Sequence, residues 1–201
     1  MGCFMKKEFA TLLLVFICLT MFTGCQQTQN IKLTYKPFSD DEQYLLTLTN
    51  NKILMYDLKN LPTDNKYTII LTYEVYKDSK KIKDEIITQA YYDGSAKKYT
   101  GTKVIGINIT SNTIRCVLTT DSAYINNKLD INQDFSNCSQ TFLSNDVALQ
   151  PGKDIYLFYA TTSTNLQGSL TNGTHVDDNM INDIVKDNEL HAFIKLKFEE
   201  N

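Results

Sequence analysis

The chain has 201 residues, of which 42% are hydrophobic, so it is long enough to bury the core of one domain. Its 20 lysine and arginine residues are nearly balanced by 23 acidic residues, which gives a net charge of −3 at pH 7. The basic residues are scattered along the chain, whereas a nucleic-acid-binding protein gathers them on one face. We therefore expect no nucleic-acid partner.

The first 24 residues have the order of a secretory signal. Lys6 and Lys7 precede an apolar run over residues 9–21, and small residues follow that run. A helix of this length spans only about 20 Å, whereas the hydrocarbon core of a bilayer is roughly 30 Å thick. Residues 1–24 are therefore predicted to be a signal peptide rather than a transmembrane helix.

The signal ends in the sequence Phe-Thr-Gly-Cys at residues 22–25, which resembles the lipobox of bacterial lipoproteins. Phe22 stands where that family usually has leucine. The resemblance covers residues 5–25 and implies that the Cys25 thiol is lipidated and that the mature chain begins there. Because two acyl chains hold a protein on a bilayer almost permanently, we expect a lipid-anchored protein on the extracytoplasmic face of the cell membrane. An ordinary signal peptide with an incidental cysteine is the alternative.

Two further cysteines, Cys116 and Cys138, remain in the predicted mature chain. They form an even pair in an oxidising location, which makes them a candidate disulfide. In the chain-entropy model a loop of this length gives a stabilisation of about 3 kcal/mol. Two free thiols are the alternative.

The predicted mature chain divides into a polar tether, residues 25–30, and a single domain, residues 31–201. Apolar residues alternate with polar ones over 67–76 and 190–198, which is typical of strands with one buried face. In the second of these segments His191 is expected to face solvent. The other predicted strands are 43–49, 52–58, 84–92, 103–110, 113–120, 140–149 and 154–162.

One segment, residues 177–185, breaks the alternation. Met180, Ile181 and Ile184 fall at helical spacing, and Asp177 or Asp178 is placed to cap the first turn. A short helix is therefore predicted just before the last strand. The pattern as a whole predicts an all-β fold, an antiparallel β-sandwich that is immunoglobulin-like in general form, with a small closed barrel as the alternative.

Few residues have the spacing of a catalytic or metal site. His175 lies close to Asp177 in the sequence, and these two residues are the candidates for a metal-binding or enzymatic site. A role as a helix cap explains Asp177 equally well. Residues 130–136 alternate oxygen-bearing side chains like a calcium loop, but Phe135 and Thr141 stand where such a loop needs glycine and glutamate. The usual motifs of serine and zinc hydrolases are missing from the sequence. We expect no catalytic residue, metal ligand or cofactor.

These observations predict a membrane-anchored envelope lipoprotein whose β-sandwich binds a ligand or partner. The expected partner is an envelope or membrane protein, or a cell-wall ligand. The alternative is an extracytoplasmic enzyme or metal-binding protein with a site around His175 and Asp177.

Overall fold

The computed structural model describes residues 30–48, 51–62, 65–93, 103–119, 123–164, 171–173 and 176–201. Cys25, the predicted tether up to residue 29, and His175 lie outside the described residues. Over the described ranges the chain forms eleven strands and two helices. In chain order these are β1 (Lys32–Tyr35), α2 (Asp40–Leu48), β2 (Lys52–Lys59), β3 (Tyr67–Lys77), β4 (Lys80–Tyr92), β5 (Lys103–Ile109), β6 (Thr113–Thr119), β7 (Tyr124–Asp130), β8 (Ser139–Phe142), β9 (Val147–Ala148), β10 (Asp154–Thr161), α3 (Asp178–Ile184) and β11 (His191–Glu200).

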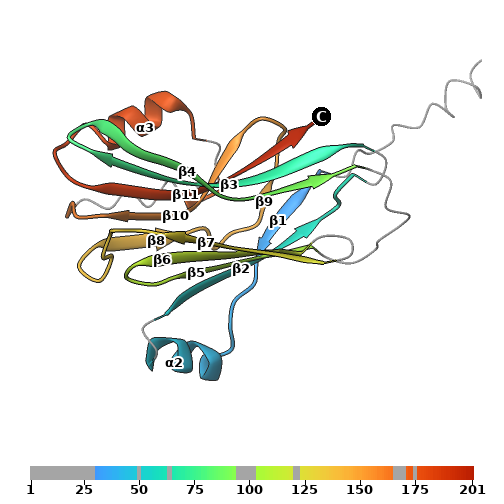
Figure 1. Ribbon diagram of the computed structural model, residues 1–201, viewed down its shortest axis with the longest axis horizontal. Helices are drawn as coiled ribbons and strands as arrows, with labels where there is room; N and C mark the ends of the chain where they lie inside the picture. The colour runs from blue at the N-terminus through green and yellow to red at the C-terminus, as the bar shows by residue number, and fades with distance from the viewer. Residues whose placement is uncertain are drawn as a thin grey trace, which may run out of the picture.

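The strands form two antiparallel sheets that pack face to face (Figure 1). One sheet has the order β7-β6-β5-β2-β1-β9, and the other has the order β4-β3-β11-β10-β8. Helix α3 lies over the outer face of the five-stranded sheet, and α2 projects from the opposite side of the body. This arrangement confirms the predicted antiparallel β-sandwich with one short helix before the last strand.

The core between the sheets consists of the apolar side chains that alternate with polar ones along the strands. The inward residues of β3 are Tyr67, Ile69, Leu71, Tyr73 and Val75, and all of them are buried. The inward residues of β11 are Ala192, Ile194, Leu196 and Phe198, and they are buried as well. Burial of an aliphatic or aromatic side chain contributes about 1.5–3 kcal/mol, so these two central strands supply a large part of the stability of the fold.

Most predicted strands are present, and the differences lie at the edges of the sheets. Residues 140–149 form two short strands, β8 and β9, instead of one. Two strands, β1 and β7, were not predicted. Strand β7 is an edge strand whose side chains are mostly exposed, so its sequence lacks the apolar face that alternation would reveal.

The prediction of a strand over residues 43–49 is wrong, because residues 43–48 lie in helix α2; residue 49 is outside the described residues. The helix begins with a capping box: the Ser39 amide and hydroxyl donate to the Glu42 carboxylate at 2.9 and 2.7 Å, and the Glu42 amide donates to the Ser39 hydroxyl at 3.4 Å. Asp40, Asp41 and Glu42 also place negative charge on its first turn, where the helix dipole favours it. The local capping signal outweighs the alternation of Tyr44, Leu46 and Leu48.

The helix predicted over residues 177–185 is confirmed as α3. The carboxylate of Asp177 caps it by accepting a hydrogen bond of 2.9 Å from the Met180 amide. Ile181 and Val185 face the outer surface of the five-stranded sheet, where they join a second, smaller core. The members of this core on the sheet are Tyr76, Tyr156, Tyr159 and Phe193.

Two adjacent isoleucines on β4 provide a test of the packing. Ile87 is 4% exposed and belongs to the main core, whereas Ile86 is 57% exposed. We expect Ile87→Ala to lower the free energy of unfolding by about 2–5 kcal/mol, because it leaves a cavity in the core. Ile86→Ala is the matched control and should change it by about 0.5 kcal/mol or less. Chemical denaturation measures both, and equal losses would contradict the assigned faces of β4.

Candidate functional site

A pocket of about 290 Å³ opens at the end of the sandwich next to α2. It exists because neighbouring strands differ in length. Strand β1 ends at Tyr35, which pairs with Tyr56, so β2 extends beyond it from Met55 back to Lys52. The chain leaves β1, forms α2 and returns to β2, which places the helix beside the end of β2 that pairs with β5 but not with β1.

The walls of the pocket come from four parts of the chain, of which the first two are consecutive and the other two are distant in sequence. These are the end of β1, helix α2 with the start of β2, the turn between β5 and β6, and the segment that precedes and includes β8. The lining residues are Tyr35, Gln43, Leu46, Thr47, Asn51, Lys52, Ile53, Leu54, Ile109, Thr110, Ser111, Asp134, Phe135, Ser136, Gln140 and Phe142. The lining therefore combines aromatic and aliphatic surface with a small number of polar groups, as is typical of ligand sites.

Lys52 supplies a positive charge to the pocket. Its ammonium group donates to the Gln140 side-chain oxygen at 2.8 Å and lies 5.7 and 5.5 Å from the ring centres of Phe142 and Phe158. Burial disfavours the charged form and lowers the pKa of Lys52 below its ordinary value. Cation–π contacts with the two rings offset part of this cost.

Contacts with the core fix the wall that is formed by β8 and the segment before it. The Gln140 side-chain nitrogen donates to the Phe135 carbonyl at 2.6 Å, and the Phe135 ring packs edge-on against Phe158 with their centres 5.8 Å apart. Tyr35 packs against Phe142 at 5.4 Å. These contacts fix Gln140, which in turn orients the ammonium group of Lys52. The pocket is therefore largely pre-formed.

Asp134 provides the negative charge that lines the pocket. Its carboxylate accepts hydrogen bonds of 2.9 Å from both the amide and the hydroxyl of Ser136, and these bonds hold its pKa below the ordinary value. In the segment with a calcium-like pattern, residues 130–136, the last three residues therefore line the pocket. Asp130, at its start, is paired with Lys128 at 2.7 Å.

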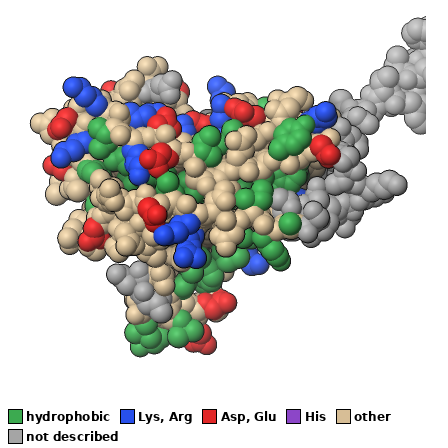
Figure 2. Space-filling view, in the orientation of Figure 1, with side chains coloured by type: hydrophobic (Ala, Val, Ile, Leu, Met, Phe, Trp, Pro, Cys, Tyr) green, Lys and Arg blue, Asp and Glu red, His purple; other side chains and the backbone are tan. Residues whose placement is uncertain are grey.

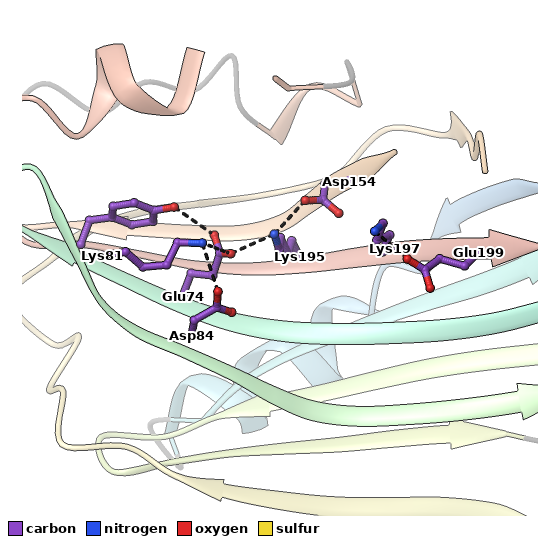
Figure 3. Close-up of polar contacts among 8 residues, drawn as sticks. Glu74, Lys81, Asp84, Asp154, Lys195, Lys197 and Glu199 are labelled. Carbon is purple, nitrogen blue, oxygen red and sulfur yellow. Dashed lines mark hydrogen bonds and ion pairs between the residues drawn. The ribbon is translucent and has the colours of Figure 1, made fainter. Parts of the chain in front are cut away.

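A second polar cluster lies on the outer face of the five-stranded sheet (Figure 3). Glu74 is 1% exposed, and its carboxylate is 2.8 Å from the Lys81 ammonium and 2.9 Å from that of Lys195. Lys195 also contacts Asp154 at 2.7 Å, and Lys81 contacts Asp84 at 3.2 Å. Burial opposes the charged form of both lysines, but these partners outweigh it and raise their pKa values. Because each charge faces an opposite one, this network is best explained as structural.

The prediction that His191 faces solvent is wrong: its side chain is 1% exposed. The residue does lie on the outer face of its sheet, but that face is covered near α3 by the second core. The Nδ1 atom is 2.9 Å from the Tyr159 hydroxyl, and Nε2 is 2.6 Å from the Asp187 carboxylate. A substrate cannot reach an imidazole this buried, so the Tyr159–His191–Asp187 chain serves the fold rather than catalysis.

The alternative site around His175 and Asp177 receives no support from the residues that can be placed. Asp177 is engaged as the cap of α3. Across the described residues, no group of three or more histidine, cysteine, aspartate or glutamate side chains is arranged to hold a metal ion.

Both cysteines of the candidate disulfide are free thiols in the structure, and the bridge stays a prediction. Cys116 is fully buried on β6, and burial raises the pKa of its thiol to about 12. Cys138 is half-buried in the loop before β8, and its thiol points at the Asp134 carbonyl, 3.9 Å away. Burial, followed by the nearby Asp134 charge, raises the pKa of the Cys138 thiol as well. Neither thiol has the lowered pKa of a nucleophile.

Comparison of the chain with known protein families, with curated proteins and with solved structures finds no match. Within the placed parts of the chain, neither helix has the length and apolar character needed to cross a bilayer. The pocket next to α2 is therefore identified by its geometry alone. Sequence patterns did not single it out, because its lining residues come from 35–54, 109–111 and 134–142, which are far apart in the chain.

The two thiols should differ in reactivity. In the folded chain we expect iodoacetamide to label Cys138 slowly and to leave Cys116 unmodified, since only the thiolate reacts and Cys116 is inaccessible. Peptide mass spectrometry before and after unfolding in guanidinium measures both sites. If neither cysteine is labelled after unfolding unless a reductant is added, the pair is bridged.

Proposed function

We propose that this protein is a lipid-anchored envelope protein whose β-sandwich binds a small ligand in the pocket next to α2. The observation that carries the proposal is the pocket, which joins aromatic walls to the Lys52 ammonium and the Gln140 amide. Pockets of this composition are the usual sites of small-molecule binding. The lipobox-like sequence ending at Cys25 supports the anchor.

Reversible binding fits these residues better than catalysis does. Among the lining residues, Lys52 is bonded to Gln140 and Asp134 to Ser136, and no histidine or cysteine is present. A general base or nucleophile needs a partner that activates it, and the lining provides no such pair. Lys52 and Gln140 can instead hold a ligand group by hydrogen bonds.

A partner protein is the second candidate, favoured by the outward surface of α2. Figure 2 shows hydrophobic side chains gathered on this projecting helix. Tyr44, Leu45 and Leu48 are 61–66% exposed, and α2 has no buried residue. Adjacent exposed apolar side chains of this size are typical of interaction sites. An envelope or membrane protein that covers α2 would also close the neighbouring pocket.

The pocket is tested by filling it. We expect a subset of a library of fluorinated fragments to bind the full-length chain in lipid nanodiscs, as seen by line broadening in ¹⁹F NMR. Thr47→Trp should abolish this binding, because Thr47 lines the pocket. Tyr44→Trp is the matched control on the exposed surface of the same helix and should leave binding intact. Fragments that bind Thr47→Trp as well as wild type, or no binding fragments at all, would contradict the proposal.

The anchor and the partner are tested together in cells. We expect Cys25→Ala to move the protein from the membrane fraction to the soluble fraction, because it removes the site of lipidation. A photo-crosslinking residue at Leu45 should capture one dominant membrane protein if α2 docks a partner, and Cys25→Ala should prevent that capture. The same residue at exposed Ile86 is the control position. Retention of Cys25→Ala on the membrane would contradict the anchor.

A further inference from the structure

Several lysines of the β-sandwich contact carboxylates, and in the placed parts of the chain Lys52 does not. Among the described residues it forms no ion pair, and its polar contact is with the neutral Gln140 amide. Lys195, which is half-buried like Lys52, contacts two carboxylates, Glu74 and Asp154. Within the described ranges, the positive charge at the pocket therefore lacks the carboxylate partners that Lys195 has.

This arrangement leaves hydrogen-bonding capacity on a side chain that lines the pocket. An ammonium group has three donors, and Gln140 accepts one of them. The rings of Phe142 and Phe158 contribute attraction without accepting a conventional hydrogen bond. Because burial disfavours the charged form of Lys52, an anion that enters the pocket restores favourable interactions that the free protein lacks.

The remaining lining defines the shape and charge of such an anion. Tyr35, Phe135 and Phe142 provide flat apolar walls, which suit an aromatic or other planar body. Asp134 contributes a negative charge to the same pocket. Among the described residues that line it, Lys52 alone is basic. One cation and one carboxylate in the same lining disfavour a dianion such as a phosphate monoester more strongly than a singly charged anion.

We propose that the pocket next to α2 binds a small organic carboxylate with a flat apolar body, whose carboxylate accepts hydrogen bonds from Lys52. The apolar body of the ligand lies against Tyr35 and Phe142. This inference rests on the proposed function, since it names the class of ligand that the binding pocket takes. It implies that the affinity of the pocket for its ligand depends on the negative charge of the ligand.

A pair of probes of nearly equal size separates charge from shape. The probes are 4-(trifluoromethyl)benzoate and 4-(trifluoromethyl)benzamide, titrated by ¹⁹F NMR against the full chain in nanodiscs, with empty nanodiscs as the baseline. We expect the benzoate to bind roughly tenfold more tightly than the benzamide, the ratio that one charge-assisted hydrogen bond supplies. Lys52→Met keeps the length of the side chain and should remove this preference by weakening benzoate binding alone.

Controls separate the possible failures. Lys153→Met removes an exposed lysine that does not line the pocket and should leave both affinities unchanged. If Lys52→Met lowers the folded fraction, Lys52→Gln provides a second neutral variant, and the benzoate-to-benzamide ratio in wild type still tests the inference. Equal binding of both probes, abolished by Thr47→Trp, would overturn the inference and keep the proposed function. Binding of neither probe would overturn the inference, while the wider fragment screen decides the proposed function.

Discussion

The pairing of β3 with β11 is the constraint on which the rest of the structure depends. The two strands pair from His191 opposite Tyr76 to Glu200 opposite Tyr67, at the centre of the five-stranded sheet. Because their inward side chains are buried, a slip of one residue would expose the whole apolar set. The ion pair between Glu74 and Lys195 joins diagonal neighbours on the other face, so both faces of the sheet specify the same register.

Two charges on this framework have contrasting environments. Glu74 is buried between two lysines, and each charge in the network around it contacts an opposite charge. Lys52 is half-buried beside neutral groups, and its pocket is open. The first arrangement stabilises one structure, whereas the second leaves a charge with no carboxylate partner in the part of the chain that the structure describes. The different lengths of β1 and β2 produce this second arrangement, since an equally long β1 would lie where the pocket now opens.

The sequence predicts the sandwich well and the pocket poorly, for a physical reason. Alternation in β3 and β11 and the cap of α3 at Asp177 are local patterns with strong energetic consequences, and the structure has them. Helix α2 was predicted as a strand because its apolar residues alternate, although Ser39 and Glu42 carry a capping signal. The pocket has no local pattern, because Lys52 gains its role from Gln140 and Phe158, and only the folded sheets bring these residues together. The burial of His191 likewise depends on the cover near α3 on the outer face of its sheet.

The position of β11 also orders events during synthesis. The hairpin of β3 and β4 can form early, because its strands are adjacent in the chain. The other edge of β3 pairs only with β11, which leaves the ribosome far later, and β10 also needs β11 to join that sheet. Until then an edge of unpaired amides and carbonyls stays available to other chains. The hairpin of β3 and β4 thus lacks its partner strand until residues 191–200 have been synthesised, and a chaperone can bind the exposed edge in that interval.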